Sequence, residues 1–190
     1  MAGTKKKASG AGARKYNKAE VAVPGRRDAL YLICGLLSLS IAVITLVSLI
    51  SYLYTWADDQ SLFSDNDILN ALVDVENGGG KLGLVLANFL VSKLFGLGTF
   101  VIPFFFGGVA LFCLKIKRVR LLRLFFISLF GCIIISVLFS YIFSFTSFDN
   151  WFGGGAGGSY GYYVNEWLKG MVGNIGAGAI IAVALTAWLI

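Results

Sequence analysis

The sequence predicts an all-α membrane protein with four transmembrane helices, both termini in the cytoplasm, and a short interfacial helix before the second span. Three observations predict this fold class. The 190 residues are 57% hydrophobic and 14% charged, with a mean hydropathy of +0.80, whereas soluble domains carry about 25% charged residues. Four segments stay apolar over about 20 residues, the length that a helix needs to cross a bilayer. Basic residues gather in alternate loops, which sets the orientation.

The first predicted span covers residues 30–54 and contains no charge. Its apolar run exceeds the about 7–15 residues of a signal peptide, so we expect a retained helix. The basic tail before it, residues 1–29, has almost no apolar clustering and is expected to be disordered. The transmembrane domain is then residues 30–190, with further spans at about 94–114, 121–146 and 171–190 and outer loops at about 55–93 and 147–170.

Charge predicts the orientation. The tail and the loop between the second and third spans are basic, whereas the first outer loop is acidic. Because translocation of Lys and Arg is disfavoured, the basic segments are expected in the cytoplasm. The tail has three open roles: setting topology, binding anionic lipid, or contacting nucleic acid. The residues with a topological or lipid role are Lys5, Lys6, Lys7, Arg26 and Arg27 in the tail and Lys115, Lys117, Arg118, Arg120 and Arg123 in the loop.

Residues 82–114 are too long for one upright helix, since they would extend about 50 Å at 1.5 Å per residue. We expect a separate helix at 82–93, near the outer interface. Lys81, Asn88 and Ser92 share one of its faces, and Leu82, Leu86, Phe89 and Leu90 share the other. The glycines after it let the chain turn into the membrane, and Pro103 is expected to kink the span that follows.

Small residues recur at every fourth position in the third and fourth spans. In lipid, small side chains let helix backbones approach closely, so we expect these positions to form helix–helix contacts. A polar conduit is the alternative, but no ionisable residue joins either stripe. The positions are Ser128, Cys132, Ser136, Ser140 and Ser144 in the third span and Asn174, Gly178, Ala182 and Thr186 in the fourth.

The sequence indicates no catalytic, cofactor-binding or metal-binding site. Histidine is absent and the three cysteines lie in apolar runs, which argues against a disulfide or zinc framework. Residues 153–158 read GGGAGG, and a dinucleotide site would need this motif between a strand and a helix. Here it lies in a glycine-rich outer loop, so we interpret it as flexible. The carboxylates scattered through 58–76 are expected to keep the first outer loop solvated.

One stretch of the chain resembles a known family. Asn77, Gly78, Gly79 and Gly83, followed by an F-G step at Gly96 and by Pro103, are similar to the N-terminal membrane domain of FtsK/SpoIIIE DNA translocases. In that family the first external loop ends in a similar N-x-G-G-x-x-G run. The basic tail, the four spans and the glycine-rich outer loop fit as well, so the resemblance covers residues 26–190.

The resemblance implies a membrane-anchoring, oligomerisation and divisome-contact domain of a septal DNA translocase, acting in cell division and chromosome partition at the bacterial inner membrane. This segment would not be an enzyme and would hold no cofactor. ATP, Mg²⁺ and DNA would bind only to a motor domain beyond it. The expected partners are the bilayer, further copies of the chain and divisome membrane proteins.

The sequence ends at Ile190 inside the last predicted span, so we expect the chain to be the N-terminal part of a longer protein. The alternative function is a free-standing four-helix membrane scaffold or an accessory subunit of a transporter.

Overall fold

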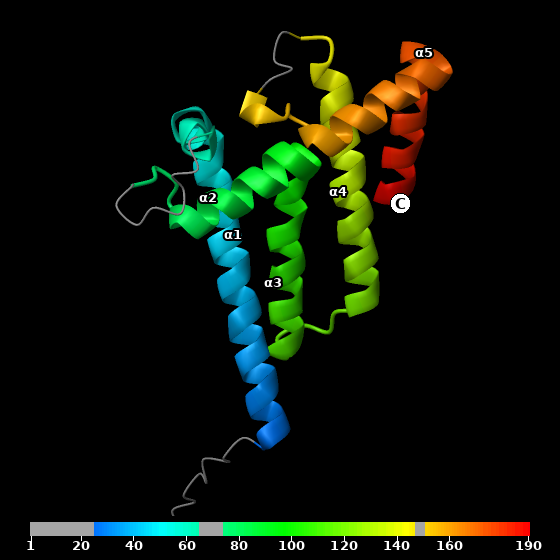
Figure 1. The fold of residues 1–190 in the computed structure, drawn as a ribbon. Helices are drawn as coiled ribbons and strands as arrows, with labels where there is room; N and C mark the ends of the chain where they lie inside the picture. Colours follow the sequence, from blue (N-terminus) through cyan, green and yellow to red (C-terminus); the bar gives the residue numbers. More distant parts are fainter. Residues whose placement is uncertain (1–24, 65–73, 147–150) are drawn as a thin grey trace, which may run out of the picture.

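The computed structural model describes residues 25–64, 74–146 and 151–190, and all elements within them are helical (Figure 1). The long helices are α1 (Arg26–Ser64), α3 (Val101–Cys113), α4 (Leu121–Phe143) and α5 (Gly158–Leu189), and the short ones are α2 (Gly80–Asn88), η2 (Phe89–Phe95), η3 (Gly96–Phe100) and η4 (Trp151–Gly153). Four helical stretches are long and apolar enough to cross a membrane. The prediction of an all-α membrane protein with four transmembrane helices is therefore confirmed.

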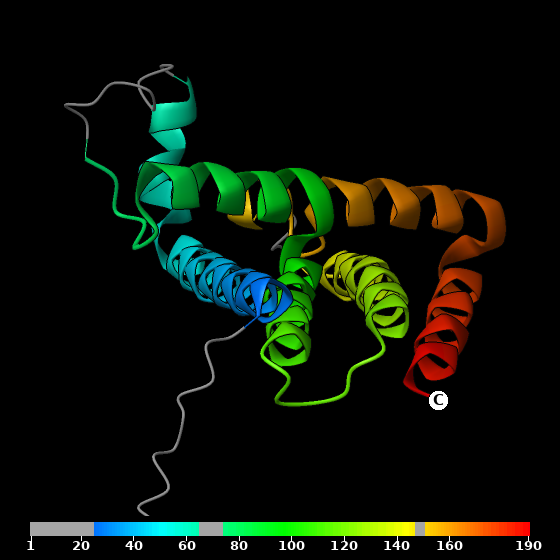
Figure 2. The same cartoon turned by 90° about the horizontal axis from the view of Figure 1, so that it is seen from below.

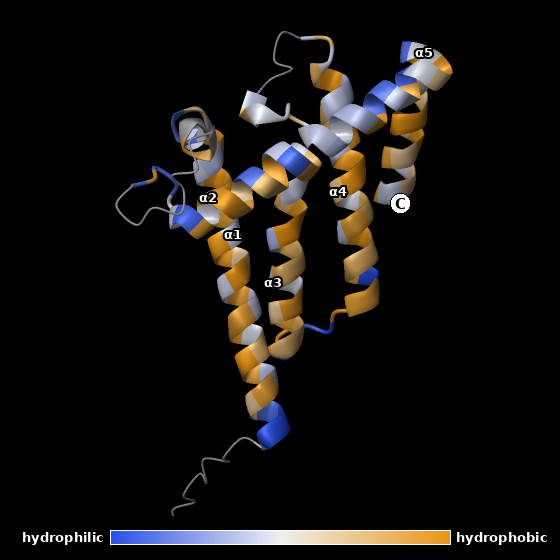
Figure 3. Cartoon of the chain, in the orientation of Figure 1, coloured by the Kyte–Doolittle hydropathy of each residue, from blue (hydrophilic) through white to orange (hydrophobic). Residues whose placement is uncertain are grey.

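Four upright helices form a row in the order α1, α3, α4 and the second half of α5 (Figure 1 and Figure 2). Neighbours in this row meet at glycines, whose missing side chains allow close approach. The pairs are Gly35 with Leu114, Gly108 with Leu124, and Gly131 with Trp188. No more than 28% of the most apolar window of any of the four candidate spans is buried, so most of the row faces outward, as expected in lipid. Figure 3 shows the upright helices as mostly hydrophobic.

Two further helical segments cross one face of this row near its upper end in Figure 1, and we call them the arms. The first arm is α2 with η2, residues 80–95, and the second arm is the first part of α5, residues 158–172. Figure 2 shows the arms running nearly end to end across the row. Each arm turns into an upright helix at a glycine with positive φ, which is 56° at Gly96 and 73° at Gly173.

The prediction that Pro103 kinks the second span is wrong. Pro103 lies in the first turn of α3, where backbone N–H groups have no partner within the helix, so its missing N–H bends nothing. The corner lies instead at Leu94, with φ −107° and ψ −105°, and at Gly96, with φ 56° and ψ −132°. The second upright helix starts after that corner with η3.

The first arm is the separate helix expected at 82–93, but two of its polar residues, Asn88 and Ser92, face protein, while Lys93 is exposed. Ser92 is buried, and the amide of Asn88 accepts a hydrogen bond from Tyr52. The exposed face carries apolar side chains instead, with Leu82 85% and Phe89 52% exposed. Asn88 therefore helps to hold the arm to α1, and Leu90 of the predicted apolar face is buried as well.

We name the two ends of the row by their composition. The basic end comprises the starts of α1 and α4 and the loop at 114–120, and the glycine-rich end comprises both arms with the segments 74–79 and 151–157. The main cluster of buried hydrophobic side chains lies at the glycine-rich end, where α1, the first arm and η4 meet. It consists of Leu49, Tyr52, Leu84, Ala87, Leu90, Val91 and Phe152.

Candidate functional site

Asn77 ties the segment before the first arm to α1. Its side chain is 3% exposed, and its Nδ2 donates a hydrogen bond to the carbonyl oxygen of Ser48 at 3.0 Å. Its Oδ1 accepts one from the N–H of Gly79 at 2.8 Å, and its own carbonyl accepts one from Gly80, also at 2.8 Å. One buried amide thus joins α1 to the start of α2.

The glycines after Asn77 allow α2 to lie against α1. The N–H of Gly78 donates to Ser51 Oγ at 2.8 Å. A Cβ at either Gly79 or Gly83 would overlap Ser48 Oγ, which is fully buried. The family-like N-x-G-G-x-x-G run therefore packs directly against α1. A larger residue in place of Gly79 or Gly83 would push α2 away from α1.

Asp59 does not behave as a solvated loop residue, so the interpretation of the 58–76 carboxylates is wrong at this position. It lies in the last part of α1, is 2% exposed, and accepts the N–H of Glu76 with its Oδ1 at 3.1 Å. A signal was present in the sequence, because Asp59 follows Tyr52 at the seven-residue spacing of one helix face. The hydroxyl of Tyr52 donates to Asn88 Oδ1 at 2.9 Å and lies 3.2 Å from the carbonyl oxygen of Phe152.

The GGGAGG segment is packed rather than flexible, which corrects the interpretation made from sequence. Ala156, Gly157 and Gly158 are buried. The carbonyl of Ala156 accepts the N–H of Leu97 at 2.8 Å, and the carbonyl of Gly157 accepts the hydroxyl of Ser136 at 2.6 Å. The segment therefore bridges the two arms and α4.

Backbone contact explains why so many glycines gather here. A Cβ at Gly96 would overlap the carbonyl of Ala156, and one at Gly154 would overlap the carbonyl of Ser92. Towards α4, a Cβ at Gly98 or Gly157 would overlap a carbonyl of that helix. We call this meeting point the glycine junction; it comprises Ser92, Gly96, Gly98, Gly154, Gly157 and Gly158 with Cys132, Ser136 and Ser140 of α4.

The predicted stripe on α4 lies largely at this junction. Cys132, Ser136 and Ser140 are buried, whereas Ser128 and Ser144 are half-buried. The positions are those at which glycines of other segments approach the helix, as expected from small side chains.

The stripe on α5 is placed differently. Gly178 faces the hydroxyl of Tyr141 on α4, so it packs within the chain. Asn174, Ala182 and Thr186 are exposed, and the side chains that α5 buries in its upright half are Ala177 and Ile181. The side chains at three of the four predicted positions are therefore not buried within one chain, because the buried face is rotated from theirs.

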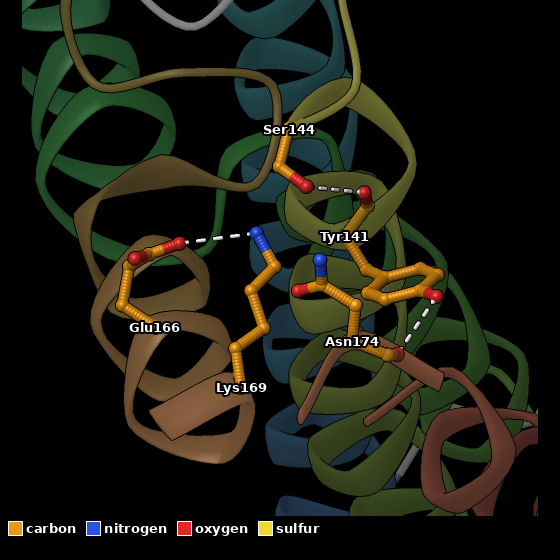
Figure 4. A network of polar contacts seen from close by, with 5 residues as sticks. All are labelled: Tyr141, Ser144, Glu166, Lys169 and Asn174. Carbon is orange, nitrogen blue, oxygen red and sulfur yellow. Dashed lines mark hydrogen bonds and ion pairs between the residues drawn. The ribbon is translucent and has the colours of Figure 1, made fainter. Parts of the chain in front are cut away.

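A polar cleft of about 250 Å³ opens beside the junction, between α4, the 154–157 segment and the second arm. Its lining includes Ser140, Ser144, Tyr162, Glu166 and Lys169. Figure 4 shows Lys169 directed at Glu166, and their charged atoms lie 3.1 Å apart. Nearby, the hydroxyl of Tyr141 donates to the carbonyl of Asn174 at 3.1 Å. The ion pair therefore lies within the second arm, and the hydrogen bond of Tyr141 joins α4 to the upright half of α5.

Sequence reasoning missed Asn165 on the second arm. Its side chain is 0% exposed, and its amide has no hydrogen-bond partner among the described residues. Such a buried, unpaired amide costs about 1–3 kcal/mol. No local pattern marks the residue, since its burial follows from how the arm lies on α4.

At the basic end, Arg26 and Arg27 open α1, and Lys115 follows α3. Lys115 Nζ lies 2.6 Å from Asp28 Oδ1. This hydrogen bond raises the pKa of Lys115 above its usual value. Arg120 and Arg123 are exposed, and Lys5, Lys6 and Lys7 lie outside the described residues.

Within the described residues, no group of three or more His, Cys, Asp or Glu side chains is placed to hold a metal ion. What the geometry does define is a membrane domain whose best-packed part is the glycine-rich end: four spans, two arms, and a junction of backbone contacts. This is the class of a multi-pass membrane domain.

The comparison with protein families identifies the family of this membrane domain. The chain matches the model of the 4TM region of DNA translocase FtsK/SpoIIIE over residues 29–190, and it therefore belongs to that family. The match spans the transmembrane part of the chain and begins just before the first predicted span. Neither the curated proteins nor the solved structures compared with it gave a match.

Proposed function

We propose that this chain anchors a DNA translocase in the bacterial inner membrane at the division septum, where the enzyme acts in cell division and chromosome partition. The observation that carries the proposal is the family match over residues 29–190. In this proposal the ATP- and Mg²⁺-dependent motor and its DNA-binding surface belong to another part of the protein. The residues of this chain contribute anchoring and contact.

The shape of the domain supports an anchoring role. The arms cross the upright row at the glycine-rich end (Figure 2). The second arm also exposes a stripe of large side chains. Tyr163 is 70% exposed, Trp167 62% and Met171 68%. Their spacing of four residues places them on one face of the arm. This face is the surface that we assign to divisome membrane proteins.

Localisation in dividing bacteria tests the proposal. A fluorescent protein fused to the C-terminus of residues 1–190 should form a band at the septum. The double variant Tyr163→Ser/Trp167→Ser should remain in the membrane fraction and lose the band. Leu122→Ser, which changes a side chain 77% exposed at the basic end, is the matched control and should keep it. Uniform membrane fluorescence of the unaltered chain would contradict a septal role.

Homo-oligomer formation is the second part of the proposal. Ala182 and Thr186 are exposed small residues on the upright half of α5, and such residues favour close packing of helices in lipid. Ala182→Leu is expected to reduce the oligomer size in mild detergent while the monomer stays folded. Gly178→Leu should instead destabilise the monomer, since its side chain would overlap Tyr141. Unchanged oligomer size in Ala182→Leu would argue against this interface.

A further inference from the structure

A cavity of about 610 Å³ lies at the basic end, between the start of α1 and the loop that joins α3 to α4. Three of its lining residues are cationic: Lys115, Lys117 and Arg118. The other three, Tyr31, Phe112 and Val119, give it an apolar or aromatic wall. The cavity therefore combines positive charge with apolar surface at the end of two membrane-spanning helices.

The loop reaches this position through a helix cap in which lysine occupies a glycine site. The N–H of Lys115 donates to the carbonyl of Phe112, and the N–H of Ile116 donates to the carbonyl of Leu111, both at 3.0 Å. This is the Schellman pattern, whose left-handed residue is usually glycine. Lys115 holds that conformation with φ 58°. A lysine here is unfavourable for the backbone, which indicates that its side chain has a role.

The side chain of Lys115 fixes one wall of the cavity. Its Nζ bonds to Asp28 at 2.6 Å and lies 5.9 Å from the ring centroid of Tyr31. Asp28 offsets one positive charge. Lys117 and Arg118 supply two more, and no carboxylate in the described part of the chain pairs with either. The cavity thus keeps a net positive charge.

We propose that this cavity binds the phosphate headgroup of an anionic glycerophospholipid, with Lys117 and Arg118 as the phosphate ligands. Basic pockets between membrane helices on the cytoplasmic side are suited to such headgroups, because the charge meets the lipid at headgroup depth. The acyl chains would continue along the exposed apolar start of α1, where Leu30 is 55% exposed. The apolar wall favours a lipid over a free phosphate. The site is independent of the septal role proposed above.

Two variants with equal loss of charge test the site. Lys117→Gln/Arg118→Gln removes two cations that line the cavity, and Arg120→Gln/Arg123→Gln removes two from the neighbouring residues outside it. The basic tail is present in both, so its own attraction for lipid cancels. Purified chains in mild detergent are titrated with phosphatidylglycerol, and with phosphatidylethanolamine as the zwitterionic reference. Native mass spectrometry counts the bound lipids, and size-exclusion chromatography checks that each variant is folded.

The cavity variant should bind phosphatidylglycerol about tenfold more weakly than the unaltered chain. The control variant should differ by less than about threefold, and neither should change its binding of phosphatidylethanolamine. Equal weakening in both variants would overturn the proposal in favour of diffuse attraction by the loop. An unchanged cavity variant would overturn it as well.

Competition distinguishes lipid from other phosphates. Millimolar inorganic phosphate or a short DNA oligonucleotide should leave the bound phosphatidylglycerol in place, because neither offers acyl chains to the apolar wall. Displacement by phosphate would mean that the cavity takes phosphate without the lipid. Displacement by the oligonucleotide alone would assign the cavity to nucleic acid. Either displacement overturns the lipid proposal.

Discussion

Both arms turn into the membrane at a glycine, but the two corners are built in opposite ways. At Gly96 the backbone is surrounded, because the carbonyl of Ala156 and the backbone of Gly157 and Gly158 occupy the space where a Cβ would lie. At Gly173 no atom beyond its chain neighbours and the nearby backbone of its own helix lies within 4 Å of that space. A glycine with positive φ therefore forms both corners. We call the closely packed one at Gly96 the locked corner and the unpacked one at Gly173 the open corner.

The contrast extends to the upright helices that follow the corners. The stretch that contains α3 has 28% of its most apolar window buried, whereas α5 has 11%. Helix α3 packs between α1 and α4, while the upright half of α5 stands at the end of the row (Figure 1). Free energies of opening vary across a protein with local packing, so the second corner is the expected place for local motion.

The largest effect is expected at the locked corner. Gly96→Ala should lower the free energy of unfolding by about 2–6 kcal/mol, from about 1–3 for the backbone conformation and about 1–3 for overpacking. Gly107→Ala is the matched control, since no atom beyond its chain neighbours and the nearby backbone of α3 lies within 4 Å of its Cβ position. It should leave stability unchanged or raise it slightly. SDS-induced unfolding in micelles, followed by tryptophan fluorescence, measures both.

A smaller loss is expected at the open corner. Gly173→Ala faces only backbone strain, because its φ is 73° and its ψ is 172°, so the cost should be about 1–3 kcal/mol. Gly170→Ala, which also has open space at its Cβ position and no positive φ, should have almost no effect. The same unfolding assay applies. If Gly173→Ala and Gly96→Ala cost the same, the distinction between the corners is wrong.

Asn77 tests how firmly the first arm is held at its other end. Asn77→Ala removes the donor to Ser48 and the acceptor of the Gly79 N–H, and should cost about 1–3 kcal/mol. Asn174→Ala is the control, because that side chain is exposed. A loss below about 0.5 kcal/mol at Asn77 would mean that the glycine contacts with α1 hold the arm without the amide.

Hydropathy and length suffice to predict the spans and the first arm. Residues 82–114 exceed a membrane thickness, which requires a break somewhere near Gly96. The second arm was not predicted, because 158–170 is rich in Gly and Tyr and resembles a loop. A signal existed in Tyr163, Trp167 and Met171, which share a helical face at four-residue spacing.

The glycine junction lies beyond what local patterns can predict. Its contacts join Ser92 to Gly154 and Gly157 to Ser136, pairs separated by long stretches of chain. A glycine that is needed for a distant backbone contact looks the same in sequence as one that gives a loop its freedom. For this reason the sequence GGGAGG predicts a flexible loop, although its backbone lies in close contact with Ser92 and with α4.

The smallest effect on stability is expected from Tyr163→Cys, since this exposed site should tolerate the change within about 0.5 kcal/mol. This variant shows on which side of the membrane the arms lie. In a Cys34→Ser background the new thiol should react with a membrane-impermeant maleimide applied to intact cells. Ile116→Cys, at the basic end and 68% exposed in the parent residue, should react only after permeabilisation.

The opposite labelling result would reverse the orientation and would also affect both proposed binding surfaces. If Ile116→Cys reacted first, the arms would face the cytoplasm, and the exposed stripe on the second arm could not meet extracytoplasmic parts of divisome proteins. The cavity at Lys117 and Arg118 would then lie in the outer leaflet, against the rule that basic loops stay inside. Both corners would keep their packing, because Gly96 and Gly173 depend on contacts within the chain and not on the side from which the membrane is entered.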